Sequence, residues 1–150
     1  NHAWIEGQKS SPLEMGLDWA VHLDKTGYFV GRRALEREQK EGSLWKLVGF
    51  EVDWEGMEPL FAQVGLPPTI PAMAVRGSLP VMHEGKQVGY ASTSTWSPVL
   101  KTYIALVHLQ RPYYEPGTKL SMEVTVEHKR LHAPGKVVKL PFYEPEWKKK

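Results

Sequence analysis

The feature that most constrains the fold is a long run of β-type sequence between Gly85 and Leu140, broken only by Gly, Pro and Ser clusters. Its clearest part is the segment from Thr118 to His128. There the apolar residues Leu120, Met122, Val124 and Val126 alternate with polar or charged ones. Period two over this length predicts a strand with one face in the core and the other in solvent.

The segment from Thr102 to Gln110 lacks this simple alternation. Ile104 and Leu106 are apolar, and so are the residues on either side of them. We therefore predict a strand that is covered on both faces and lies centrally in the sheet.

Further β-type segments bring the predicted number of strands after Gly42 to six. They are Leu44 to Asp53, Ser78 to His83, Lys86 to Ser94, Thr102 to Gln110, Thr118 to His128, and Arg130 to Pro141. The second and third form a predicted hairpin around His83-Glu84-Gly85. Short strands with frequent turns predict a closed or sandwiched antiparallel sheet, because closure protects the strand edges.

Between the first two strands, the segment from Trp54 to Val64 spaces its apolar residues as a helix does, which predicts a short surface helix. Residues 65–72 contain Pro67, Pro68 and Pro71. Proline lacks the backbone N–H that helices and sheets use, so this stretch is predicted to be loop or extended chain.

The first 42 residues have a different character. Ser11-Pro12-Leu13-Glu14 has the pattern of a capping box and predicts a helix of about one turn. Asp18 to Asp24 is interpreted as a strand with Trp19 in the core, and Gly31 to Glu41 as a highly charged helix. Gly42-Ser43 is the predicted domain boundary, because helical sequence precedes it and β sequence dominates after it.

Composition excludes several classes of function. A length of 150 residues allows one good core, or one domain plus part of another. The net charge of +2 is too small to indicate a nucleic-acid partner, and the absence of cysteine excludes disulfides, thiolate metal sites and thiol nucleophiles. No apolar run approaches the roughly 20 residues of a membrane span. The first residue is Asn1 rather than Met, so we expect a fragment or a processed chain.

The residues alone reveal no self-contained active site. Of the histidines, His108 and His128 fall in predicted strands and could approach each other in a barrel, but a metal site needs at least three convergent ligands. No Gly-x-Ser-x-Gly elbow, phosphate-binding loop or dinucleotide fingerprint occurs. The six tryptophans could line a ligand cleft. The alternative is that Trp19 and Trp45 are core residues and Trp96 closes a turn.

An ordered series of short motifs nevertheless resembles a known family. Residues 11–21 (SPLEMGLDWAV), 24–25 (DK) and 29–35 (FVGRRAL) resemble the segment S/T-P-x-E-x-G-L-x-W…D-K…F-x-G-x-x-A-L of the glycine cleavage system T-protein family. Further matches follow in that family's order, at Leu47-Val48-Gly49-Phe50-Glu51, Pro80-Val81, Gly85, Val88-Gly89, Ser97-Pro98, Ile104-Ala105, Pro116-Gly117 and Pro141-Phe142. The resemblance extends from about Ser11 to Phe142.

This resemblance implies tetrahydrofolate-dependent one-carbon transfer from an amine, in an enzyme with three domains around a central folate site. Residues 1–42 would be the C-terminal part of the α+β folate-binding domain. Residues 43–150 would form the C-terminal domain, a six-stranded antiparallel jelly-roll-like barrel. The implied partners are the upstream folate-binding domains of the same protein and either a small-molecule amine substrate or a lipoyl carrier protein. No nucleic-acid or membrane partner is expected, and the implied location is cytoplasmic.

The resemblance assigns no catalytic residue and no metal ligand to this chain, because the family's catalytic aspartate lies upstream. The chain alone is therefore expected to be inactive. Three residues are implied to bind the cofactor. Arg76 would steady the glutamyl carboxylate of the folate or an interdomain contact, unless it is an ordinary surface arginine. Trp147 would stack on a ring and Lys148 would offer a cation.

Two departures from the family pattern favour a divergent relative over a glycine cleavage protein itself. The family's Thr-Ser-Gly is Ser92-Thr93-Ser94 here, so Ser94 would be strained if that glycine served a turn with positive φ. The stretch from Trp54 to Ala74 is also longer than in most members. The alternatives are a non-catalytic folate-binding or scaffold module of the same superfamily, and a plain β-barrel interaction domain.

Overall fold

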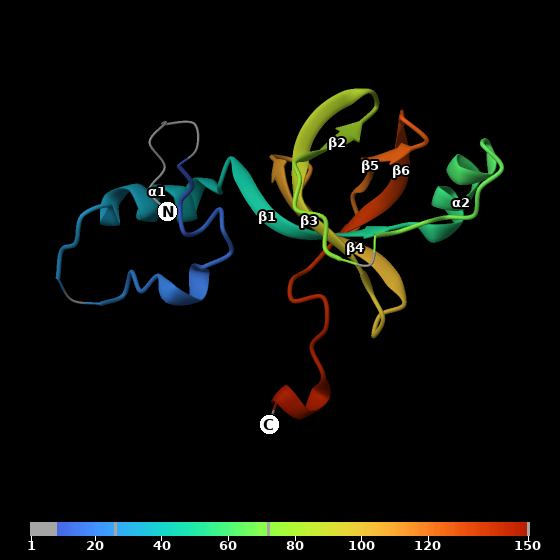
Figure 1. Cartoon of the computed structure of the whole chain (residues 1–150). Helices are drawn as coiled ribbons and strands as arrows, with labels where there is room; N and C mark the ends of the chain where they lie inside the picture. Colours follow the sequence, from blue (N-terminus) through green and yellow to red (C-terminus); the bar gives the residue numbers. More distant parts are fainter. Residues whose placement is uncertain (1–8, 26, 72, 150) are drawn as a thin grey trace.

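Six antiparallel strands form a closed barrel in the computed structural model, which describes residues 9–25, 27–71 and 73–149. The strands are β1 (Trp45–Val52), β2 (Leu79–His83), β3 (Lys86–Ser97), β4 (Thr102–Gln110), β5 (Lys119–Val126) and β6 (Lys129–Val138). Their order around the barrel is β1-β4-β3-β2-β5-β6, and β1 closes it by pairing with both β4 and β6. The predicted six-stranded antiparallel barrel is confirmed (Figure 1).

The β2–β3 hairpin was predicted correctly. Its turn is made by Glu84 and Gly85, whose φ angles are 48° and 79°. Two consecutive positive φ values are typical of the type I′ turn, whose twist matches that of the strands it joins.

The core lies inside the barrel, and in β4 every second side chain points into it. In β4 the buried residues are Tyr103, Ala105, Val107 and Leu109. Ile104 and Leu106 point outward and are only half-buried. The prediction that this strand is covered on both faces was therefore wrong. A closed barrel fills only its interior, and none of the described segments covers the outer face of β4 completely.

Helix α2 (Trp54–Ala62) is confirmed as a short helix, but it is more than a surface element. Met57 and Phe61 are buried and belong to the barrel core. Gly56 lies so close to β6 that a Cβ atom on it would overlap the ring of Pro134. The helix therefore covers one end of the barrel (Figure 1).

The predicted strand from Asp18 to Asp24 was wrong. Residues Asp18–Ala20 form the short 3₁₀ helix η2, and Trp19 is 77% exposed instead of lying in the core. The barrel strands pair among themselves, so the described structure offers this segment no strand to pair with. An alternating pattern without a partner strand does not form a sheet.

The predicted capping box and charged helix of the N-terminal part are present, but the predicted one-turn helix after Ser11 is not. The Ser11 backbone N–H donates to Glu14 Oε2 at 3.1 Å, and the Glu14 N–H donates to Ser11 Oγ at 3.0 Å. This reciprocal pair is the capping box, although it closes a turn and no regular helix follows. The charged helix is α1 (Arg32–Glu41), in which no residue is buried.

Side chains hold residues 9–43, here called the N-terminal unit, against the barrel. Within this unit, Glu38 Oε1 accepts hydrogen bonds from the hydroxyls of Ser11 (2.7 Å) and Ser43 (2.6 Å) and so joins α1 to both. From the β4–β5 loop, Arg111 donates to the Gly42 carbonyl at 2.8 Å and Tyr114 to the Ser43 carbonyl at 3.1 Å. Hydrogen bonds from Glu38 in α1 and from the β4–β5 loop thus hold the predicted boundary at Gly42-Ser43.

The C-terminal tail leaves the barrel after β6 and ends in η3 (Glu146–Lys149), which lies away from the barrel in Figure 1. The ring of Phe142 covers the backbone of Gly49 in β1, where a Cβ atom would come within 2.7 Å of it. Two motifs of the family resemblance, around Gly49 and at Pro141-Phe142, therefore meet in space.

Candidate functional site

Arg76 lies in the segment that leads into β2, directly after an isolated bridge to β3. In this bridge the backbone groups of Val75 and Ser94 exchange two hydrogen bonds, of 2.8 and 3.0 Å. The Arg76 side chain is exposed and forms no hydrogen bond or ion pair with any other described residue. Its backbone is fixed while its charge remains available to a partner.

Trp147 and Lys148 lie in η3 at the far end of the C-terminal tail. Trp147 is 70% exposed, and Lys148 is exposed as well. No described ring contact or hydrogen bond joins either side chain to Arg76. The structure therefore does not bring the three predicted cofactor-binding residues together within this chain.

Ser94 replaces the glycine of the family pattern and would be strained in a turn with positive φ. Its φ is not positive, so this strain does not arise. The register of β3 against β4 shifts between Ala91 and Thr93, and this β-bulge turns Ser94 into the core. Its hydroxyl lies 2.8 Å from that of Tyr103, and both side chains are buried. The serine thus takes part in the core instead of making a turn.

A cavity of about 430 Å³ opens where the N-terminal unit, β1 and the start of the C-terminal tail meet. We call it the junction cavity. Its charged lining residues are Asp18, Lys46, Glu115 and Lys139. The Lys46 ammonium lies 5.8 Å from the centre of the Tyr114 ring, whereas Lys139 forms no ion pair with the described residues. Sequence reasoning missed this cavity, although the alternation in β1 does place Lys46 on the outer face.

Aromatic side chains line the outer face of the barrel across three strands. The Tyr90 and His108 rings are stacked, with centres 5.0 Å apart and planes at 15°, and Trp45 lies 6.3 Å from Tyr90. Burial lowers the pKa of His108 below its usual value, and the nearby Glu14 carboxylate acts in the opposite direction. The Glu14 carbonyl accepts a hydrogen bond from the Leu47 N–H at 2.7 Å, which docks the N-terminal unit on this face.

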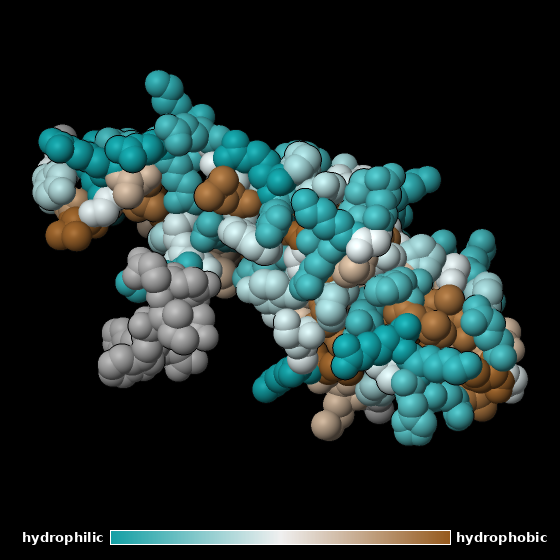
Figure 2. Space-filling model, turned by 90° about the horizontal axis from the view of Figure 1, so that it is seen from above, coloured by the Kyte–Doolittle hydropathy of each residue, from teal (hydrophilic) through white to brown (hydrophobic). Residues whose placement is uncertain are grey.

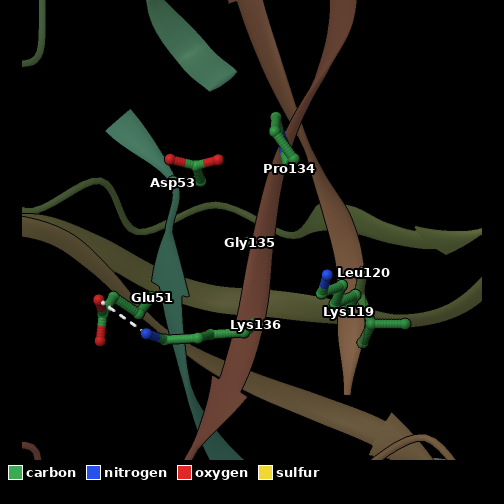
Figure 3. A pocket seen from close by; sticks show the side chains of 7 residues that line it. All are labelled: Glu51, Asp53, Lys119, Leu120, Pro134, Gly135 and Lys136. Atoms are coloured by element: carbon green, nitrogen blue, oxygen red, sulfur yellow. Dashed lines mark ion pairs between the residues drawn. The ribbon is translucent and has the colours of Figure 1, made fainter. Parts of the chain in front are cut away.

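A second cavity, of about 420 Å³, lies beside β6 and contains both signs of charge (Figure 3). Lys136 Nζ lies 3.4 Å from Glu51 Oε1. Asp53 and Lys119 lie on opposite sides of β6 in this view. Two carboxylates and two ammonium groups balance each other, so this cavity does not select a ligand by net charge.

The N-terminal unit exposes an unusual amount of apolar surface. Its exposed large hydrophobic side chains are those of Leu17, Trp19, Tyr28, Phe29 and Val30, the last of them 94% exposed. Figure 2 shows hydrophobic atoms at the surface of this unit, beside the hydrophilic side chains of α1. Apolar surface gathered in this way usually marks a site of contact with another protein surface.

The described residues contain no group of three or more His, Asp or Glu side chains arranged to hold a metal ion. In particular, His108 stacks on Tyr90, and His128 lies in the β5–β6 turn with a φ of 69°. None of the helices in the described part of the chain is long and apolar enough to cross a membrane.

Comparison with known proteins gives a consistent result. Residues 62–144 match the model of the glycine cleavage T-protein C-terminal barrel domain. An aminomethyltransferase of Synechococcus sp. (strain RCC307) is 37% identical over 134 residues, which are 89% of this chain and 32% of that protein. One from Prochlorococcus marinus (strain NATL2A) is 33% identical over 134 residues, or 89% of this chain and 30% of that protein.

A solved structure has the same fold. The glycine cleavage system aminomethyltransferase T from Bartonella henselae aligns with a TM-score of 0.62 and 18% sequence identity, over 89% of this chain and 32% of that one. This chain therefore spans about a third of the length of the relatives it matches.

Proposed function

Because this chain belongs to the glycine cleavage T-protein family and matches its C-terminal barrel domain, we propose that it acts as the C-terminal part of a tetrahydrofolate-dependent aminomethyltransferase. The whole protein would transfer a one-carbon group from an amine to the folate. Such chemistry depends mainly on holding the two reactants in attack geometry, and a carboxylate of the proposed upstream domains would steer the proton.

The main support for the proposal is the large solvent-exposed surface of this chain, which spans only about a third of the length of its relatives. A compact monomer of this mass exposes roughly 7,700 Å², whereas this chain exposes 10827 Å². Part of the exposed apolar surface lies on the N-terminal unit, around Trp19 and Val30. An upstream domain packed there would bury it.

The exposed apolar side chains of the N-terminal unit support a division into two domains. Residues 1–42 would complete an upstream α+β domain, and residues 43–150 would form the barrel domain that closes over it. The clamp from Arg111 and Tyr114 to the Gly42-Ser43 backbone would fix the angle between the two. The proposed location of the protein is the cytoplasm.

We assign Arg76, Trp147 and Lys148 to the cofactor. All three are exposed, and each could bind a folate held mainly by the upstream domains. A guanidinium or an ammonium group would bind the glutamyl carboxylates, and the indole would stack on an aromatic ring of the folate. The amine donor would be a small molecule or a group on a lipoyl carrier protein.

The test is to express the complete gene product and residues 1–150 side by side. Tetrahydrofolate binding is measured by calorimetry, and transfer by the tetrahydrofolate-dependent loss of the one-carbon group from the amine. We expect binding and turnover only in the longer protein. Arg76→Ala should weaken tetrahydrofolate binding about tenfold, the usual effect of losing one charged hydrogen-bonded pair.

Two controls make the result specific. Arg37→Ala removes an exposed charge from α1 and should leave tetrahydrofolate binding unchanged. If Lys139→Ala weakens binding while Arg76→Ala does not, the cofactor occupies the junction cavity and the residue assignment is wrong. Tetrahydrofolate binding without transfer would indicate the scaffold alternative, and turnover by residues 1–150 alone would contradict the proposal.

A further inference from the structure

Two tryptophans form an open corner on the barrel surface that the proposed function does not use. The centres of the Trp54 and Trp96 rings are 5.2 Å apart, and their planes meet at 65°. The cavity beside them has a volume of about 470 Å³ and is lined by Trp54, Pro68, Ile70, Pro71, Thr95, Trp96 and Pro98. We call it the tryptophan corner. Its volume lies within the range of roughly 300–1,000 Å³ that is usual for small-molecule sites.

The corner is exposed rather than a piece of the core. Trp96 is 37% exposed, and Val99 in the adjacent turn is exposed too. Trp54 is half-buried and packs partly against the core, which fixes its ring. Trp54 also lies outside residues 62–144, so the corner is not made by the matched barrel sequence alone.

The electrostatics of the corner favour a cation. The face of an indole ring carries negative potential and attracts ammonium groups within about 6 Å. The Trp54 indole N–H donates to Glu58 Oε1 at 2.7 Å, so a carboxylate is held against the edge of one ring. None of the described residues that line the corner is a lysine or an arginine, so none of them already places a cation in it.

The lining also determines the kind of cation. Among the side chains that line it, only the hydroxyl of Thr95 can accept a hydrogen bond, because an indole N–H only donates. A primary ammonium has three N–H groups, each of which needs a hydrogen-bond acceptor. It would lose the water molecules that accept these bonds when it enters the corner. A quaternary ammonium has no N–H, and its methyl groups gain from burial against indole and proline rings. We propose that the tryptophan corner binds the methylated ammonium group of a small molecule.

The test uses choline as the probe and 3,3-dimethyl-1-butanol, its uncharged isostere, as the matched ligand. The indole N–H signals of the 150-residue chain are followed by ¹H–¹⁵N NMR during titration. Choline should shift the signals of Trp54 and Trp96 saturably, while that of the distant Trp19 stays in place. The isostere should bind at least tenfold more weakly, because it lacks the charge.

Substitutions then locate the site. Trp96→Leu should abolish the choline-dependent shift of Trp54, and Glu58→Gln should weaken binding two- to fivefold. Trp96 is partly exposed, so this variant is expected to fold, and unchanged signals of the barrel residues would verify it. Equal affinity for choline and its isostere would reduce the corner to a non-specific apolar patch and overturn the proposal. The absence of saturable binding would overturn it as well.

Discussion

Single residues in the barrel carry identifiable parts of its stability. Ser94 and Tyr103 share a hydrogen bond of 2.8 Å inside the core. Replacing either residue by Ala or Phe, respectively, leaves the other hydroxyl buried without its partner, which costs about 1–3 kcal/mol. We expect each of Ser94→Ala and Tyr103→Phe to lower the free energy of unfolding by about this amount.

Urea denaturation of the double variant tests this expectation. If the two hydroxyls are hydrogen-bonded to each other, the double variant loses less stability than the sum of the losses in the two single variants. Ser92→Ala is the matched control, because the Ser92 hydroxyl is exposed and makes only a long 3.3 Å bond to the Leu106 carbonyl. Strict additivity of the two core substitutions would contradict the pairing.

His108 should make the stability depend on pH. Burial lowers its pKa in the folded protein, so the unfolded chain takes up the proton more readily. The neutral imidazole therefore contributes stability that is complete above pH of about 6.5 and is lost as the pH falls from there toward the lowered pKa. We expect urea midpoints to fall more between pH 8 and pH 5 in the unaltered chain than in His108→Gln.

The control for this pH dependence is His128→Asn. His128 lies in an exposed turn with a φ of 69°, which asparagine tolerates. This variant should keep the full pH dependence of the unaltered chain. If His108→Gln keeps it as well, another group is responsible.

At the scale of elements, α2 can pack closely on β6 because Gly56 has no side chain. In a helix interior, Gly→Ala usually stabilises by about 0.5–1 kcal/mol. At Gly56 the added Cβ would overlap the Pro134 ring, which cannot rotate away. We expect Gly56→Ala to reverse the usual sign and destabilise the chain by about 1–3 kcal/mol, as overpacking does.

Thermal unfolding followed by circular dichroism measures this effect. Gly77→Ala is the matched control, because a Cβ at that position meets nothing closer than 4.0 Å. That variant should unfold at nearly the same temperature as the unaltered chain. A stabilised Gly56→Ala would mean that α2 does not dock on β6 as described.

At the scale of the whole molecule, the chain should be less compact than an ordinary domain. The N-terminal unit and the C-terminal tail both project from the barrel (Figure 1). A compact chain of this length has a radius of gyration of roughly 15 Å. We expect X-ray scattering of the monomer to give a clearly larger radius. A value near 15 Å would mean that the N-terminal unit and the tail fold back onto the barrel.

The sequence by itself determined which segments of the barrel form strands. The period-two pattern of residues 118–128 and the turn residues Glu84 and Gly85 predicted β5 and the β2–β3 hairpin, and the order of short motifs predicted the family. These signals are local, because the direction of a side chain in a strand depends on its neighbours in the sequence. The capping box at Ser11 and the charged helix α1 were predictable for the same reason.

Only the tertiary structure decided which segments pair and which side chains meet. The residues from Asp18 to Asp24 alternate like a strand yet have no partner strand, and the bulge in β3 turns Ser94 inward against the simple alternation. Trp54 and Trp96 come from distant segments, so no local pattern could reveal their corner. The exposure of Arg76 and Trp147 likewise depends on the three-dimensional packing. Strand pairing, burial and contacts between distant residues all join parts of the chain that are far apart in the sequence. They stabilise the protein only when the barrel has formed, so a local sequence pattern does not reveal them.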